Sequence, residues 1–209
     1  MKSPFLLSLF ALAFTATAAD SGDGWQQLFD GKSLDGWKAS DEPGTFSVVN
    51  GEIVVHGARS HLFYDGPVSN HDFKNFEVKA DVLTKPGSNS GFYFHTKWQE
   101  KDWPEAGFEV QVNNSHKDPK RTAGLYDVDD NLAEVAKDDE WFTLTIRVEG
   151  RHVVTMVNEK VVIDYTAPEG FPPSRKHPGR IIDHGTFAIQ GHDPNSEVHF
   201  KNIRVKPLP

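Results

Sequence analysis

Three short runs of this chain place polar residues at alternate positions, with side chains that could carry acid–base chemistry. Glu and His side chains can exchange protons with a substrate, and Tyr, Gln and Asn side chains can hold one by hydrogen bonds. Because alternate residues of a β-strand point to the same face, each run would present its polar groups together. The runs are Tyr93 and His95; Glu109, Gln111 and Asn113; and Gln190 and His192.

The segments that carry these runs are predicted to be β-strands. Apolar and polar residues alternate over 76–82, 108–113 and 142–148, which indicates strands with one buried face. Residues 46–55 form a predicted hairpin around Asn50-Gly51, a pair that favours the tight two-residue turn. Two more strands are predicted within 153–165, on either side of Asn158-Glu159, and further strands within 186–190 and 197–205. Roughly ten to twelve such strands indicate an all-β fold, a jelly-roll sandwich of two antiparallel sheets.

The N-terminus has the three parts of a secretory signal peptide. Lys2 precedes an apolar run from Phe5 to Phe14, and small residues ending at Ala19 follow. The apolar run is too short to span a bilayer, so we expect no membrane anchor after cleavage. Residues 1–19 would then be the signal peptide and 20–209 a single domain, periplasmic or secreted. The chain has no cysteine, so packing alone must stabilise it.

The charge of the chain argues against one class of partner. The formal net charge is −8 at pH 7, and the acidic residues are spread along the sequence without a basic cluster. Proteins that bind nucleic acids usually carry a basic patch or stripe. We therefore expect no nucleic-acid partner.

Long irregular segments between the predicted strands could cover a binding site. They span 98–107, 113–140 and 167–185, and they contain Trp98, Trp103 and Tyr126. Sugars are bound by several fixed donors and acceptors together with aromatic rings, so the polar runs and these rings suggest a carbohydrate platform. The alternative is that the polar runs form the ordinary solvent-exposed face of a sandwich.

Several motifs resemble the 3-keto-disaccharide hydrolase domain family. They occur in the family's order and cover essentially the whole chain after the predicted signal peptide. The chain departs from the family pattern at His95, where many members carry Arg, at Gly191 and at Glu159. The matching motifs are Gln27-Leu28-Phe29-Asp30-Gly31-Lys32-Ser33-Leu34-Asp35-Gly36-Trp37, Asn75-Phe76-Glu77, Asn89-Ser90-Gly91-Phe92-Tyr93-Phe94, Phe108-Glu109-Val110-Gln111-Val112, Glu140-Trp141-Phe142 and Phe200-Lys201-Asn202-Ile203-Arg204-Val205.

This resemblance implies a concanavalin A-like jelly roll that acts on glycosides whose sugar is oxidised at C3. The ketone makes the proton at C2 acidic, so a base can remove it and the glycosidic oxygen at C1 can leave by β-elimination. Water can then add to the enone, which gives net hydrolysis. The expected partner is therefore an oligosaccharide or glycoside substrate.

The polar runs supply candidates for each role in this reaction. Glu109 and His192 are the candidate base and acid, in either order, and His95 with Gln111 and Gln190 would hold or polarise the keto group. A divalent metal ion held by His and carboxylate groups could serve as the electrophile instead. The remaining candidate substrate-binding residues are Tyr93, Asn113, Trp98, Trp103 and Tyr126.

Two other functions are compatible with the same fold. A lectin-like module would bind sugar without cleaving it. A conventional retaining glucanase would need two neighbouring carboxylates, which Glu109-Val110-Gln111-Val112-Asn113-Asn114 does not provide, so this class is disfavoured.

Overall fold

The structure is a computed structural model that describes residues 23–169 and 176–209. The predicted signal peptide over 1–19 and its cleavage site lie outside the described residues, as do Pro172 and Pro173 of the third irregular segment. Within the described ranges the chain forms thirteen β-strands and two short 3-10 helices, η1 (Pro43–Thr45) and η2 (Val68–His71). No helix in this part of the chain has the length and apolar character that crossing a membrane requires.

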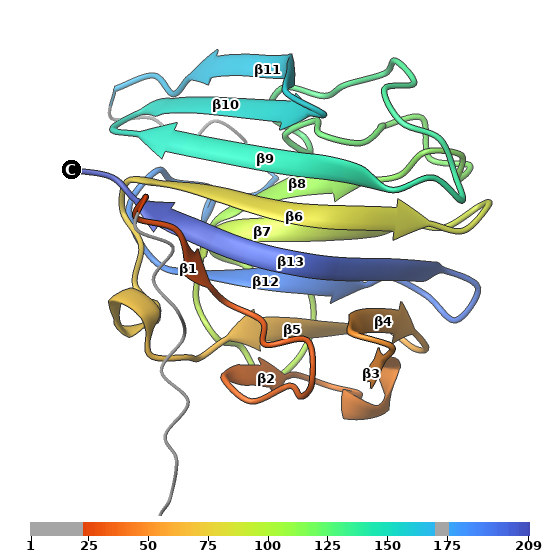
Figure 1. Cartoon of the computed structure of the whole chain (residues 1–209). Coiled ribbons are helices and arrows are strands. Elements are labelled where there is room, and N and C mark those ends of the chain that lie inside the picture. Colours follow the sequence, from red (N-terminus) through yellow and green to blue (C-terminus); the bar gives the residue numbers. More distant parts are fainter. Residues whose placement is uncertain (1–22, 170–175) are drawn as a thin grey trace, which may run out of the picture.

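The strands form two antiparallel sheets stacked face to face, which confirms the predicted sandwich (Figure 1). The smaller sheet has five strands in the order β2 (Trp37–Ala39), β5 (Ser60–Tyr64), β12 (Thr186–Gly191), β7 (Ser90–Thr96) and β8 (Phe108–Val112). The larger sheet has eight strands: β11 (Lys160–Thr166), β10 (His152–Val157), β9 (Phe142–Glu149), β6 (Phe76–Thr84), β13 (Glu197–Pro207), β4 (Glu52–His56) and β3 (Phe46–Val49) in order, with β1 (Gln26–Gln27) paired to β13.

Two predicted hairpins have the backbone conformation that their turn residues favour. β3 and β4 are joined by Asn50 and Gly51, with φ of 51° and 85°. Asn158 and Glu159, which join β10 and β11, also have positive φ, at 48° and 67°. Two consecutive positive φ values make the type I′ turn, whose twist matches that of the strands it joins.

The burial pattern differs between the two sheets. β6 of the larger sheet alternates between buried and half-exposed residues, as its sequence predicts for a strand with one solvent face. In contrast, every residue of β5, β7, β8 and β12 is buried. The second face of the smaller sheet is therefore covered, and the interpretation of its polar residues as an ordinary solvent-exposed face is wrong.

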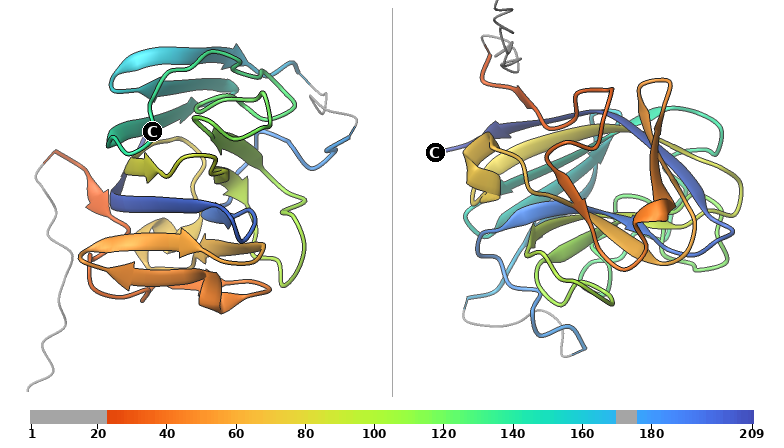
Figure 2. Two further views of the ribbon diagram at one scale, coloured as in Figure 1. Left: turned by 90° about the vertical axis from the view of Figure 1, so that its right-hand side faces the viewer. Right: turned by 90° about the horizontal axis from the view of Figure 1, so that it is seen from below.

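Loops provide this cover. In the view from below, the connection between β7 and β8 and the segment that leads into β12 project beyond the smaller sheet, on the side away from the larger sheet (Figure 2). The segment between β8 and β9 adds isolated bridges, with Leu125 paired to Val110 and to Asp129. We call this loop-covered side of the five-stranded sheet the inner platform.

Candidate active site

Three neighbouring strands place the central residues of the site on the inner platform. β7 pairs with β8 so that Tyr93 lies opposite Glu109 and Gly91 opposite Gln111. β12 pairs with the other side of β7, and Gln190 projects from it toward the same residues. Because opposite residues of an antiparallel pair share a face, this register gathers side chains that are far apart in the sequence.

Glu109 is at the centre of a hydrogen-bond network. The Tyr93 hydroxyl donates to Glu109 Oε2 at 2.9 Å, and Gln190 Nε2 donates to Glu109 Oε1 at 2.9 Å and to the Tyr93 oxygen at 3.0 Å. In the orientation that satisfies both ends of its amide, Gln111 donates to Glu109 Oε1 at 3.2 Å and to the Ser90 carbonyl at 3.3 Å. The network fixes the carboxylate of Glu109 in one position.

Gly91 leaves the space that the carboxylate occupies. A Cβ atom built at this position would lie 2.6 Å from Glu109 Oε1 and 2.9 Å from Glu109 Cγ. Both distances are shorter than contacts that real Cβ atoms make. The glycine of the Asn89-Ser90-Gly91 motif is therefore required by the close approach of Glu109.

Burial gives Glu109 the character of a base. It is 6% exposed, and removal from water raises the pKa of its carboxyl because the charged form loses its hydration. The charge of Arg180 and the hydrogen bonds from Tyr93 and Gln190 oppose this shift. Burial and the Glu109 charge together raise the pKa of Tyr93 well above its usual value, so the phenol keeps its proton.

A buried arginine supplies the positive charge of the site. Arg180 Nη2 lies 3.8 Å from Glu109 Oε2, and the guanidinium lies 5.4 Å from the ring centroid of Tyr126. Arg180 is 6% exposed, and its Nη1 has no hydrogen-bond partner among the described residues. A buried cation with free donors is suited to an oxygen that becomes negative during a reaction.

A pocket of about 220 Å³ opens above this network. Trp103, 42% exposed, lies at its rim, with its ring centroid 5.5 Å from that of His192. The Nδ1 atom of His192 is 2.8 Å from Asp193 Oδ2, which leaves Nε2 to exchange a proton. The lining residues are Asn89, Tyr93, Trp103, Pro104, Glu109, Gln111, Asp118, Tyr126, Asp127, His177, Arg180, Gln190 and His192.

The family described as the 3-keto-alpha-glucoside-1,2-lyase-like domain matches residues 24–206, nearly all of the chain that the structure describes. The chain belongs to this family. A curated relative, named 3-keto-disaccharide hydrolase, comes from Bacteroides thetaiotaomicron. It is 29% identical over an alignment that covers 89% of this chain and 79% of the relative.

Solved structures share the fold of this 3-keto-alpha-glucoside-1,2-lyase-like domain. A candidate glycosyl hydrolase from Parabacteroides distasonis superposes with a TM-score of 0.75 at 23% identity, covering 90% of this chain and 95% of that one. The carbohydrate binding module CBM66 from Bacillus subtilis superposes with a TM-score of 0.58 at 12% identity, covering 82% of this chain and 95% of the module. At these identities the likeness shows the fold alone.

Most of the residues singled out in the sequence meet in this one pocket of the 3-keto-alpha-glucoside-1,2-lyase-like domain. Some come from β7, β8 and β12, where side-chain alternation points them to one face of the sheet. The others come from three loops that cover this face. Residues from both predicted groups, the acid–base candidates and the candidate substrate-binding side chains, are present. They are Glu109, His192, Tyr93, Gln111, Gln190, Trp103 and Tyr126.

His95 lies elsewhere, and the expectation that it shares a face with Tyr93 is wrong. Thr186 pairs with Thr96 but Ala188 pairs with Tyr93, so two residues of β7 oppose one of β12. This bulge, with a φ of 53° at His95, reverses the side chain, and its Nε2 bonds to the Lys74 carbonyl at 2.9 Å. Burial lowers the pKa of His95 to about 4, so the ring is neutral and holds the loops together.

Asn113 and Trp98 also lie outside the pocket. Asn113 Nδ2 donates to the carbonyls of Asp118 and Lys120 at 3.0 and 2.7 Å, so it supports the loop rather than facing a ligand. Trp98 lines a separate cavity next to the other end of β5. The alternation of β8 ends before Asn113, because β8 stops at Val112.

Sequence reasoning missed Arg180 and His61. Arg180 follows His177-Pro178-Gly179 in the third irregular segment, where no strand pattern indicates its direction. His61 lies opposite Gln190 on β5, fully buried, with ring centroids 5.5 Å from Tyr93 and 5.6 Å from Trp103. The sequence around His61 resembles that of an ordinary core strand, so only the pairing of β5 with β12 places His61 beside the site.

The predicted alternative of a metal electrophile finds no ligand set in the described part of the chain. No group of three or more His, Asp or Glu side chains there could hold a metal ion together. Glu109 and Arg180 are buried charged side chains of the pocket, and the carboxylates of Asp118 and Asp127 also line it.

Proposed function

We propose that this protein cleaves the glycosidic bond of 3-keto-glycosides, and of 3-keto-disaccharides in particular, by β-elimination. The observation that carries the proposal is the pairing of a buried carboxylate, Glu109, with a buried cation, Arg180, at the floor of one small pocket. An enolate-forming reaction needs a base beside a positive group. Membership of the family and the name of the Bacteroides thetaiotaomicron relative support the same reaction.

Glu109 is the base in this proposal. It takes the proton from C2, the electron pair of the C–H bond forms the C2–C3 double bond, and the C3 oxygen becomes an enolate. Burial favours this role, because a carboxylate with a raised pKa binds a proton more strongly than one in water. The Tyr93 and Gln190 hydrogen bonds fix its direction.

Arg180 is the group that stabilises the enolate. Its Nη1 has no partner among the described residues, so it can donate to the C3 oxygen without breaking an existing hydrogen bond. Gln190 Oε1 also lacks a partner in the described part of the chain and can accept from a sugar hydroxyl. Donors that are already in place cost no reorganisation when charge develops.

His192 is the acid. The enolate electrons re-form the C3 carbonyl, the C1–C2 double bond forms, and the C1–O bond breaks toward the leaving oxygen, which takes a proton from His192. The products are an enone and the free alcohol or sugar. Addition of one water molecule across the double bond converts the enone to the 3-keto sugar. Asp193 orients the ring through Nδ1.

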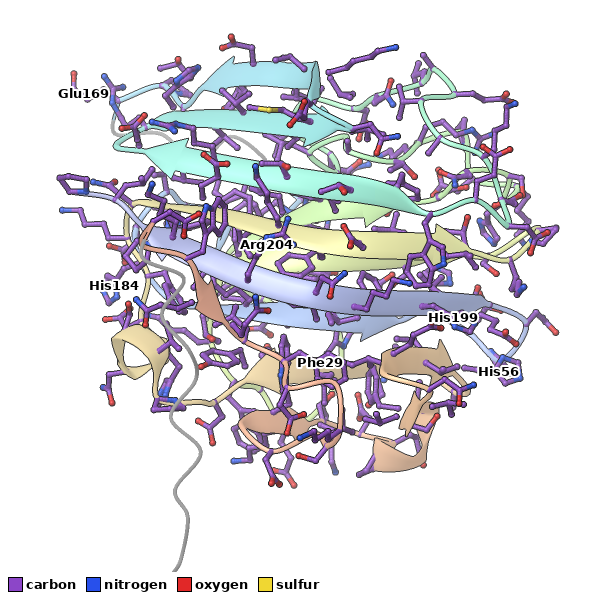
Figure 3. The ribbon with its side chains drawn as sticks, in the orientation of Figure 1. Phe29, His56, Glu169, His184, His199 and Arg204 are labelled. Carbon is purple, nitrogen blue, oxygen red and sulfur yellow. The ribbon has the colours of Figure 1, made fainter. Side chains whose placement is uncertain are left out.

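Proton exchange in D2O separates the two roles. Wild-type protein should release the alcohol from a 3-keto-glucoside and exchange deuterium into C2, both followed by NMR. Glu109→Gln should lose exchange and release, whereas His192→Gln should retain exchange and lose release. His199→Gln is the matched control, because His199 lies on the larger sheet between Glu52 and Glu197, away from the pocket (Figure 3). Full release by Glu109→Gln, with the fold intact, would refute the assignment.

Sugar binding without cleavage is the second candidate, and the pocket's aromatic rim favours it equally. It predicts saturable binding of a glycoside with neither C2 exchange nor release from any 3-keto substrate. The NMR experiment therefore distinguishes the two functions in one sample. A chelator added to the active protein tests whether a metal ion contributes.

We also propose that the chain acts outside the cytoplasm after removal of residues 1–19. The support is the charged start, apolar run and small-residue end of that segment. N-terminal sequencing of the protein recovered from the periplasm or medium should begin after Ala18 or Ala19. Recovery only in the cytoplasm with Met1 intact would contradict the proposal.

A further inference from the structure

A second pocket lies on the same side of the five-stranded sheet as the active-site pocket. Its volume is about 360 Å³, and neither the hydrogen-bond network of Glu109 nor the proposed reaction uses it. Its walls come from the end of β5, the η2 turn, the residues that follow β7, and the start of β12. The lining residues are Phe63, Tyr64, Asp65, Asn70, His71, Asp72, Thr96, Lys97, Trp98, His184, Gly185 and Thr186.

The linings of the two pockets are in contact on the inner platform. Ala188 of β12 pairs with Phe63 on one side and with Tyr93 on the other, and the three residues form a small apolar cluster of their own. Phe63 lines the second pocket and Tyr93 lines the first. Two strand spacings separate them, roughly 10 Å. The two linings are therefore close enough for one ligand longer than a single sugar ring to contact both.

The aromatic wall of the second pocket is exposed. Trp98 is 43% exposed, although large aromatic residues are usually buried, and its ring is held by Lys38, whose Nζ lies 3.5 Å from the centroid. The cation fixes the ring without covering it entirely. An indole held in this way offers a flat apolar surface to a sugar ring.

A buried hydroxyl in this pocket has no partner. Thr96 is fully buried and lines the second pocket, yet its Oγ1 makes no hydrogen bond to any described residue. Buried polar groups are nearly always satisfied, so an orphan hydroxyl indicates a site for a water molecule or a ligand hydroxyl. This observation is independent of Trp98.

The charges of the pocket indicate an uncharged ligand. Asp65 and Asp72 would repel an anion, and Lys97, which lines the same pocket, would repel a cation. Asp65 Oδ1 lies 3.8 Å from His71 Nε2, and Asp72 Oδ1 lies 2.6 Å from His184 Nδ1. His184 lies at this end of the molecule, next to the η2 turn (Figure 3). No metal-ligand group of three is found in the described ranges. Carboxylates, imidazoles and a free hydroxyl around an exposed indole suit a neutral polyhydroxylated ring.

We propose that the second pocket binds a further sugar unit of the substrate, on the leaving-group side of the bond that is cleaved. A di- or oligosaccharide is then a better substrate than a glycoside with a small aglycone. This inference rests on the proposed function of the first pocket. It assigns Trp98 and Thr96 to substrate binding at a distance from the reacting atoms.

The test compares a 3-keto-disaccharide with methyl 3-keto-glucoside, whose methyl group cannot reach the second pocket. The measured quantity is the ratio of kcat/KM for the two substrates. Trp98→Ala should lower this ratio about tenfold, mainly through KM for the disaccharide. Trp141→Ala is the matched control, because Trp141 is 36% exposed on the other side of the molecule and likewise carries a lysine, Lys201, 3.7 Å from its ring centroid.

Thr96→Val gives a second readout. Valine has the shape of threonine without the hydroxyl, so removing an unsatisfied group should leave the melting temperature unchanged or raised. The ratio of kcat/KM for the 3-keto-disaccharide to that for methyl 3-keto-glucoside should nevertheless fall. A ratio that both Trp98→Ala and Thr96→Val leave at the wild-type value would overturn the inference while the proposed function stands.

Failure of the proposed function has a different signature. In that case wild-type protein cleaves neither substrate, and the second pocket is tested by titrating trehalose and maltotriose against tryptophan fluorescence. A saturable change that Trp98→Ala abolishes and Trp141→Ala retains supports the sugar site. Absence of any saturable change in the wild type overturns it.

Discussion

Replacing Gly91 with alanine should slow C2 proton removal about 100-fold while the domain remains folded. The added Cβ would lie 2.6 Å from Glu109 Oε1, whereas ordinary contacts begin at 3.4 Å, so the carboxylate must retreat by about 0.8 Å. A displacement of roughly 1 Å at a reacting group can cost about 100-fold in rate. Overpacking costs about 1–3 kcal/mol, partly offset by the smaller entropy of the unfolded chain.

The assay for Gly91→Ala measures C2 deuterium exchange and alcohol release from a 3-keto-glucoside, together with the free energy of unfolding. Gly44→Ala is the matched control, because a Cβ at Gly44 meets nothing within 4 Å. It should retain wild-type rates. Wild-type exchange by a folded Gly91→Ala protein would mean that the position of the Glu109 carboxylate does not limit the reaction, and the reasoning from the network would be refuted.

Two further predictions concern charge. In a pH–rate profile, the acidic limb of kcat/KM should have a pKa above the ordinary range of a glutamate. In Arg180→Met this limb should move to still higher pH, because the Arg180 charge lowers the pKa of Glu109. A limb that stays in place or moves to lower pH would contradict the role of Arg180. Burial lowers the pKa of His61 from 6.5 to about 3, so the wild type loses stability as the pH falls below about 6.5. Measured by urea unfolding, the free energy of unfolding of His61→Phe should rise by about 2 kcal/mol relative to that of the wild type between pH 7 and pH 5. If the difference between the two proteins is the same at both pH values, His61 is not held neutral.

Some features of the site follow from local sequence. The alternation of Phe108, Val110 and Val112 with Glu109 and Gln111 correctly assigns the two polar side chains to one face of β8. The same rule places Tyr93 and Gln190, because a regular strand has a fixed period of two. The alternation cannot show a bulge, and so it placed His95 on the wrong face.

The burial of Glu109 and the positive charge beside it depend on loops that are distant from β8 in the sequence. The polar face of the smaller sheet resembles a solvent-exposed face in sequence, and only the loops above it make Glu109 buried and raise its pKa. Arg180 reaches Glu109 from 71 positions further along the chain, within a segment that has no periodic pattern. Loop conformation is set by many weak contacts rather than by propensity, so neither fact can be obtained from the residues alone.

The sequence by itself determined the antiparallel sandwich, the hairpins at Asn50-Gly51 and Asn158-Glu159, and the strands that carry the polar runs. These depend on side-chain alternation and on backbone preferences of single residues, which are local properties. The tertiary structure decided which polar groups meet, which carboxylate loses its water, and where a second pocket lies on the same sheet. Proximity and desolvation depend on the whole packed chain, and they are what convert a set of residue types into a site.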